Sequence, residues 1–164
     1  MSLLPSTAKT QVLKPFVFGY ALTLAQMCEY AGRHGIEAEQ EMHNGVMCLD
    51  LDYCHDILEH MVRRTKMKTC RVVSVRMTDE EMAAIVAADP NVPSVYFCLA
   101  FGNNFCEAGL QVAKKKKMWP RLRERLGFAD EVKPRWYVLD RGDELYYCYE
   151  PLPIPVQEDS KGQT

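Results

Sequence analysis

The stretch RVVSVRMTDEEMAAIVAADPNVPSVYFCLAF, residues 71–101, reads as a strand, a helix and a second strand in succession. Arg71 to Met77 alternates apolar and polar side chains, which predicts a half-buried strand. Thr78-Asp79-Glu80-Glu81 has the form of a capping box and predicts a helix that ends before Asp89-Pro90. The continuous apolar run from Ser94 to Phe101 is typical of a strand that is buried on both faces.

Three further segments precede this unit. Phe16 to His34 is apolar on almost every side and predicts a helix. Its first part, Phe16 to Ala31, approaches the length of a short membrane span, but polar residues recur within it at every third position, which indicates a soluble helix. Val46 to Leu51 predicts a strand, and Tyr53 to Lys68 predicts a helix with one apolar stripe.

The segments after residue 101 predict two helices and a hairpin. A helix is expected from about Phe105 to Lys116, and a shorter one from Pro120 to Gly127. Trp136 to Leu139 and Glu144 to Tyr149 are two aromatic-rich runs around a turn signal, which predicts a β-hairpin. The Pro-rich stretch at 151–155 is either a ligand for a polyproline-binding groove or the extended end of the last strand.

Together these segments predict an α+β (mixed α/β) fold. Because helices separate the middle strands and the hairpin adds antiparallel pairs, we expect a two-layer sandwich in which helices pack on a mixed sheet of about five strands. The chain has 164 residues, of which 48% are hydrophobic and 26% charged, enough for one globular domain. We place that domain at 15–150, with a flexible N-terminus at 1–14 and an extended, Pro-rich to disordered tail at 151–164.

The composition limits the classes of protein and the cellular compartments that we expect. The formal charge is −2, from 20 Lys+Arg against 22 Asp+Glu, which excludes a histone-like polycation. No apolar signal sequence is visible near the start, and the seven cysteines contain no Cys-x-x-Cys pair and suggest no disulfide framework. We therefore expect a reduced, cytoplasmic or nuclear protein with no membrane partner.

The charge is distributed unevenly along the chain. Residues 114–125, here called the basic segment, carry seven basic side chains against the single acid Glu124, a local charge of +6 that leaves −8 for all other residues. Four consecutive lysines on a helix would point about 100° apart and cover every side, so part of the run must leave the packed helix as a frayed end or a loop. The candidate anion-binding and nucleic-acid-binding residues are Lys114, Lys115, Lys116, Lys117, Trp119, Arg121, Arg123 and Arg125.

Other interpretations of the basic segment stay open. Cations at a helix C-terminus are favoured by the helix dipole and keep a surface soluble. The same run also resembles a nuclear localisation signal. Aromatic rings would add stacking to a nucleic-acid site. These rings could instead pair with each other across the strands of the predicted hairpin. The aromatic side chains of that hairpin are Trp136, Tyr137, Tyr146, Tyr147 and Tyr149.

Two other groups of residues could carry chemistry. The first is Asp50, Asp52, Cys54, His55, Asp56, Glu59 and His60. Ligand types at i,i+4 spacing could hold a metal, and Cys54 could serve as a nucleophile, but ion pairs such as Glu59 with Arg63 explain the pattern equally and we expect no bound metal. The second is Gly102 to Glu107, a ligand site at a strand end or an ordinary helix cap with Asn104 as the N-cap. No Walker or Gly-x-Gly-x-x-Gly pattern occurs, and no cofactor is expected.

The sequence thus favours a non-enzymatic intracellular binding or regulatory domain. It would act through the basic segment and an aromatic sheet surface on an anionic partner, either nucleic acid or an acidic protein. One alternative is a subunit of a homo-oligomer or a larger complex with no chemistry of its own. Another is a small enzyme or ligand-binding protein with a site near Asp50–His60 and Gly102–Glu107.

Overall fold

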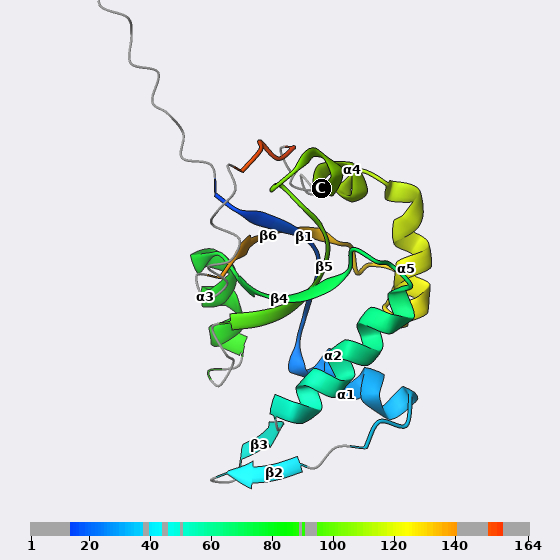
Figure 1. The fold of residues 1–164 in the computed structure, drawn as a ribbon. Helices are drawn as coiled ribbons and strands as arrows, with labels where there is room; N and C mark the ends of the chain where they lie inside the picture. The colour runs from blue at the N-terminus through cyan, green and yellow to red at the C-terminus, as the bar shows by residue number, and fades with distance from the viewer. Residues whose placement is uncertain are drawn as a thin grey trace, which may run out of the picture.

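The computed structural model describes residues 14–37, 40–43, 46–49, 51–88, 90, 95–140 and 151–155. Its elements follow one another as shown in Figure 1. In chain order they are β1 (Phe16–Leu22), α1 (Leu24–Arg33), β2 (Gln40–His43), β3 (Val46–Leu49), α2 (Leu51–Thr65), β4 (Arg71–Arg76), α3 (Asp79–Ala88), β5 (Val95–Asn103), α4 (Glu107–Ala113), the 3₁₀ helix η1 (Lys116–Met118), α5 (Trp119–Leu126) and β6 (Arg135–Leu139).

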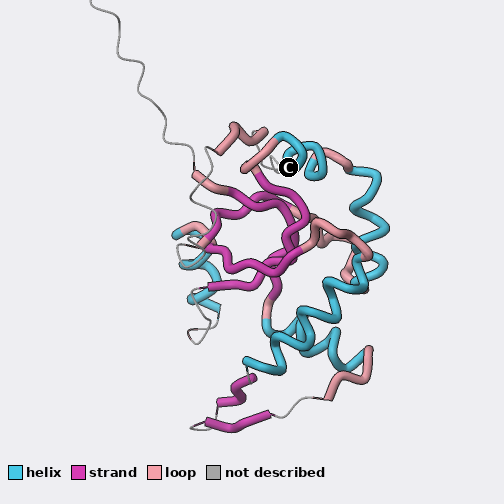
Figure 2. Tube along the Cα trace, in the orientation of Figure 1, coloured by secondary structure: helices cyan, strands magenta, loops and turns pink. Residues whose placement is uncertain are grey.

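Four of the strands form a small closed barrel in the order β1-β5-β4-β6, and β6 returns to pair with β1 (Figure 2). All of these pairings are antiparallel, and β2 and β3 form a separate two-stranded sheet. The α+β class is confirmed. The mixed sheet of about five strands in a two-layer sandwich is not: the connection from β4 through α3 returns to β5 as an antiparallel neighbour, so the helix between them does not make a parallel crossover.

Closing the sheet creates two apolar clusters, because alternate residues of each strand face opposite sides. The inner cluster consists of Val17, Val73, Val75, Tyr96, Cys98, Ala100, Tyr137 and Leu139. The outer face of the sheet packs against buried side chains of α1, α2, α4 and α5, and together they form the outer cluster. Its members from the strands are Phe18, Tyr20, Leu22, Leu99, Phe101 and Trp136. The helices therefore cover one side of the ring, while α3 contributes Met82 and Ile85 to the inner cluster.

The predicted helix from Phe16 to His34 is wrong in its first half. Residues 16–22 are strand β1, and only residues 24–33 are helical. The run is apolar on every side because one face lines the interior of the ring and the other lies under the helices. Thr23 and Gln26 form the capping box that starts α1, so they mark the boundary between the two elements. None of the described helices has the length and apolar character that a membrane crossing requires.

The capping box predicted for α3 is confirmed. The Glu81 backbone N–H donates to Thr78 Oγ1 at 3.2 Å, and the Thr78 N–H donates to Glu81 Oε2 at 2.9 Å. The Glu81 carboxylate also forms an ion pair with Arg135 on β6. The cap thus both starts the helix and ties it to the closed sheet. Of the predicted hairpin, β6 is a strand as expected, whereas Glu144 to Tyr149 lies outside the described residues.

Asn104 joins three distant segments of the chain. It is 1% exposed, and its amide Oδ1 accepts a hydrogen bond from Phe16 N at 2.7 Å. Its Nδ2 donates to the carbonyl oxygens of Lys14 at 2.9 Å and Leu152 at 3.0 Å. The Leu152 N–H in turn donates to the Asn104 carbonyl at 2.7 Å. Because Leu152 and Ile154 also pack on the outer cluster, the stretch 151–155 lies along the domain, which disfavours its presentation as a free polyproline ligand.

Candidate anion-binding site

The basic segment lies where the chain passes from α4 to α5. Helix α4 ends at Ala113, Lys114 is its C-cap, and a short 3₁₀ helix precedes α5. The expected helix from Phe105 to Lys116 is therefore shorter, and the lysine run leaves it as the geometry requires. The short helix with proline at its start is confirmed, and it ends at Gly127, whose φ of 68° is left-handed.

Five of the eight predicted site residues surround one surface hollow. It has a volume of about 660 Å³, and its lining consists of Lys114, Lys115, Lys116, Lys117, Met118 and Arg121. The four lysines and Arg121 are all exposed. None of them forms an ion pair with another residue in the part of the chain that the structure describes. We call this feature the basic hollow; the described residues leave its positive charge unneutralised.

The other two arginines of the basic segment are engaged in the fold. Arg123 forms an ion pair with Asp130 at 3.0 Å and donates to the Asp130 carbonyl, also at 3.0 Å. Burial raises the pKa of the nearby Tyr20 hydroxyl to about 12, although the Arg123 charge opposes the shift. Arg125 Nη1 donates to the carbonyl of Thr65 at 2.9 Å and so fastens the turn after α2. The structure does not bring either arginine to the basic hollow.

Trp119 is a core residue more than a surface one. Its indole ring is 5.3 Å from the ring of Phe18, and its Nε1 is buried without a hydrogen-bond partner in the described structure. The Lys116 ammonium lies 6.0 Å from the Trp119 ring centre, at the edge of a cation–π contact. The ring thus packs beneath the basic segment, and its face is not available to stack on a nucleic-acid base.

The proposed aromatic sheet surface is not formed by the described residues. Trp136 is 7% exposed and packs 5.1 Å from Phe18 in the outer cluster. Tyr137 is 8% exposed and belongs to the inner cluster, with the Arg135 guanidinium 4.4 Å from its ring. Trp136 faces the helices and Tyr137 faces the interior of the ring, so neither aromatic side chain forms an exposed sheet surface. The remaining aromatic candidates, Tyr146, Tyr147 and Tyr149, lie outside the described residues.

The residues around Asp50 to His60 do not converge on a site. Asp50 is outside the described residues, Cys54 is 5% exposed within the outer cluster, and the neighbouring His55 is exposed. The His60 ring instead hydrogen-bonds the Tyr30 hydroxyl through Nδ1 at 2.7 Å. Across the described ranges no three His, Cys, Asp or Glu side chains lie together as metal ligands.

The alternative interpretation as i,i+4 ion pairs on this helix is supported by one predicted pair. Arg63 Nη2 lies 2.6 Å from Glu59 Oε1, and both side chains are well exposed. Such a pair contributes little to stability and carries no chemistry. The exposed members of this group that the structure describes, such as His55, Asp56 and Glu59, therefore belong to a solvated helix surface, whereas the Cys54 thiol is buried.

The Gly102 to Glu107 segment is arranged differently from an ordinary asparagine cap. Asn104 is the buried tie described above, and Cys106 is the N-cap of α4, its Sγ accepting from Gly109 N at 3.4 Å. Glu107 instead accepts a hydrogen bond from Gln111 at 2.6 Å. The expected cap at Asn104 is thus wrong by two residues, because the amide satisfies backbone groups from both ends of the chain.

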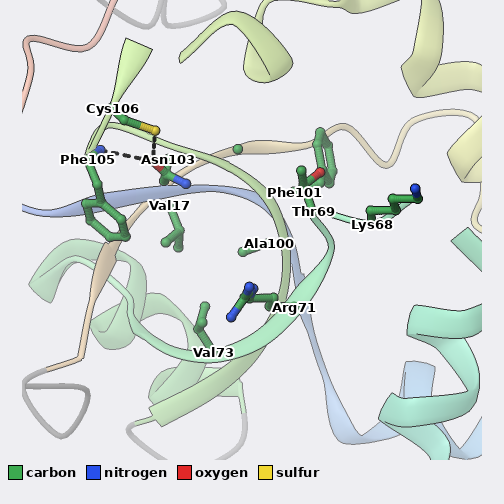
Figure 3. Close-up of a pocket in the computed structure, with 11 residues that line it drawn as sticks. Val17, Lys68, Thr69, Arg71, Val73, Ala100, Phe101, Asn103, Phe105 and Cys106 are labelled. Atoms are coloured by element: carbon green, nitrogen blue, oxygen red, sulfur yellow. Dashed lines mark hydrogen bonds between the residues drawn. The ribbon is translucent and has the colours of Figure 1, made fainter. Parts of the chain in front are cut away.

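This segment does line a cavity. Figure 3 shows it at the end of the closed sheet, bounded by Val17, Val73 and Ala100 inside the ring and by Arg71, Asn103 and Cys106 at the mouth. The sequence indicated the strand end at residue 102 as a candidate ligand site but did not indicate Arg71. One signal was present: Arg71 shares the face of Val73 and Val75 in the alternating strand, and that face is the interior of the ring.

No protein-family model, curated protein or solved structure matches this chain.

Proposed function

We propose that this protein is a non-enzymatic binding domain that holds an anionic polymer, most directly a nucleic-acid backbone, in the basic hollow. The observation that carries the proposal is the clustering of five exposed cations, unpaired within the described structure, around a single depression. When cations of this kind neutralise the phosphates of a nucleic acid, the cations condensed on the nucleic acid are released, and this release favours binding.

The chemistry of the lining favours phosphates over bases. Four of the five cations are lysines, whose compact ammonium groups act as point charges and do not require the planar, two-pronged partner that arginine prefers. The two tryptophans, Trp119 and Trp136, both pack against Phe18, so their rings are not exposed for stacking on bases. Recognition would then rest on charge and depend little on base sequence, as is expected for contacts to the backbone of a duplex.

The direct experiment measures binding of the full chain to a fluorescein-labelled DNA duplex by fluorescence anisotropy. Replacing Lys115 and Lys117 with glutamine removes two cations from the hollow. For each phosphate contact, the logarithm of the binding constant falls by about 0.9 when the salt concentration rises tenfold. Each lost contact is therefore expected to weaken binding about tenfold at about 0.1 M salt.

A matched control removes the same charge elsewhere. The double variant Lys66→Asn and Lys133→Gln changes two exposed lysines outside the hollow, and asparagine suits the left-handed backbone of Lys66, whose φ is 55°. This control is expected to bind the duplex nearly as well as the original chain. Equal losses in both double variants would reduce the effect to net charge and contradict a localised site.

A labelled polyglutamate peptide of similar charge separates the two kinds of anionic partner. Tighter binding of the peptide than of the duplex, with the same dependence on Lys115 and Lys117, would replace the nucleic-acid assignment with an acidic protein segment. Binding of neither probe would overturn the proposal.

A further inference from the structure

A second site is present at the end of the closed sheet. The cavity shown in Figure 3 has a volume of about 420 Å³ and lies at the Arg71 end of β4 and the Asn103 end of β5. Helix α3 joins the opposite ends of these two strands. Sites for small organic molecules commonly occupy about 300–1,000 Å³ and often lie in the mouths of closed sheets.

The lining separates into an apolar interior and a cationic mouth. Val17, Val73 and Ala100 face inward from three adjacent strands, and Phe105 extends the apolar wall. Lys68 and Arg71 belong to the same lining, in which no described side chain is acidic. A ligand that matches both parts has an apolar body and a negatively charged end.

Arg71 is placed for this role by the register of β4. It occupies the same face of the strand as Val73 and Val75, both of which belong to the inner cluster, and its backbone is paired with Ala100. In Figure 3 its side chain points toward the space between Ala100 and Val73. Arg71 forms no ion pair with any other described residue, so its guanidinium can donate to a ligand.

The mouth is held in position by its surroundings. Thr65 Oγ1 donates to the Val62 carbonyl at 2.7 Å and accepts from Met67 N at 3.2 Å, which shapes the turn that leads to Lys68. The Thr65 carbonyl accepts from Arg125 on α5. On the other side, Asn103 Oδ1 accepts from Phe105 N at 3.0 Å and so orients the apolar wall. Such preorganisation lowers the entropic cost of binding.

We propose that this cavity binds a small organic anion with an apolar body, of the class of medium-chain monocarboxylates. The carboxylate lies at Arg71, whose guanidinium offers a two-pronged pair of donors that matches its geometry, and the Lys68 charge adds a more distant attraction. The hydrocarbon body enters the ring against Val17, Val73 and Ala100. This site is separate from the basic hollow, because the two share no lining residue.

Octanoate is a direct probe of the full chain by isothermal titration calorimetry. Acetate lacks the apolar body, and octylamine carries the opposite charge on a similar body. We expect octanoate to bind at least about tenfold more tightly than either comparator, since one charge-assisted hydrogen bond or several buried methylenes each contribute that much. Equal binding of octanoate and octylamine, or of octanoate and acetate, would overturn the proposal.

Two variants test which side chain of the cavity binds the carboxylate. Arg71→Gln is expected to weaken octanoate binding at least about tenfold, and Lys68→Gln to weaken it less. Arg121→Gln, which removes one cation from the basic hollow, is the matched control and is expected to leave octanoate binding unchanged. Arg71→Gln is in turn expected to leave duplex binding unchanged, so the failure of either proposal is visible independently. Unchanged octanoate affinity in Arg71→Gln would contradict the assignment.

Cys106 gives a readout that needs no variant. Its exposed thiol lines the mouth of the cavity, whereas Cys28 is half-buried on α1. Octanoate in the cavity is expected to slow the alkylation of Cys106 by iodoacetamide and to leave the rate at Cys28 unchanged, as followed by peptide mass spectrometry. Unprotected Cys106 at saturating octanoate would place any bound octanoate elsewhere.

Discussion

Replacing Asn104 with alanine tests whether one buried amide holds the two ends of the described chain to the closed sheet. The change removes three side-chain hydrogen bonds, to Phe16 N, the Lys14 carbonyl and the Leu152 carbonyl, which are 2.7, 2.9 and 3.0 Å long. At about 1 kcal/mol for each bond, the free energy of unfolding is expected to fall by about 3 kcal/mol. Because Asn104 is only 1% exposed, water cannot readily replace the lost partners.

The measurement is urea unfolding of the full chain, followed by tryptophan fluorescence, since Trp119 and Trp136 both pack near Phe18. Asn103→Ala is the matched control: the half-buried neighbour contributes one side-chain to backbone bond within the described chain, and its loss is expected to cost about 1 kcal/mol. A loss in Asn104→Ala no larger than in the control would refute the idea that this amide ties the segments together.

Two other substitutions test the packing of the sheet and the cap of α3. A Cβ at Gly19 would overlap the Leu99 carbonyl of the neighbouring strand. Gly19→Ala is therefore expected to lower the free energy of unfolding by about 3 kcal/mol. A near-neutral result in the same urea assay would contradict the pairing of β1 with β5. Burial alone would raise the pKa of Glu81, but hydrogen bonds with Thr78 and the Arg135 charge lower it below its usual value of 4.5. Its folded state therefore holds fewer protons than the unfolded state, and the stability it contributes is present at neutral pH and lost as the pH falls below about 4.5. The difference in unfolding free energy between the original chain and Glu81→Gln should shrink over that range, and a difference independent of pH would contradict the ion pair.

Local signals predicted much of the secondary structure. Arg71 to Met77 alternates because its inner face lines the ring, and Thr78 with Glu81 starts α3 as the capping pattern requires. The helix predicted at residues 16–22 is wrong because both faces of β1 are buried, which removes the alternation by which a strand is recognised. The same Thr-x-x-Gln pattern at Thr23 could have placed the boundary correctly.

The closure of the sheet could not be read from periodicity. A helix between β4 and β5 is compatible with a parallel or an antiparallel return, and closure also requires pairings distant in sequence, such as those of β6 with β1 and β4. For the same reason the sequence left open whether the aromatic side chains Trp136 and Tyr137 form an exposed surface or pack against other residues, and both are buried. The basic segment was found from charge alone, while the roles of Arg123 and Arg125 depend on Asp130 and Thr65, which only the fold brings to them.

The salt dependence of duplex binding tests the central claim most directly. If all five cations of the basic hollow contact phosphates, the slope of log K against log salt is expected to be about −4.5 for the original chain and about −2.7 for the Lys115→Gln, Lys117→Gln variant. Between about 50 and about 200 mM salt, the affinity of the original chain should fall roughly 500-fold. A slope near zero, or the same slope in both proteins, would contradict the account.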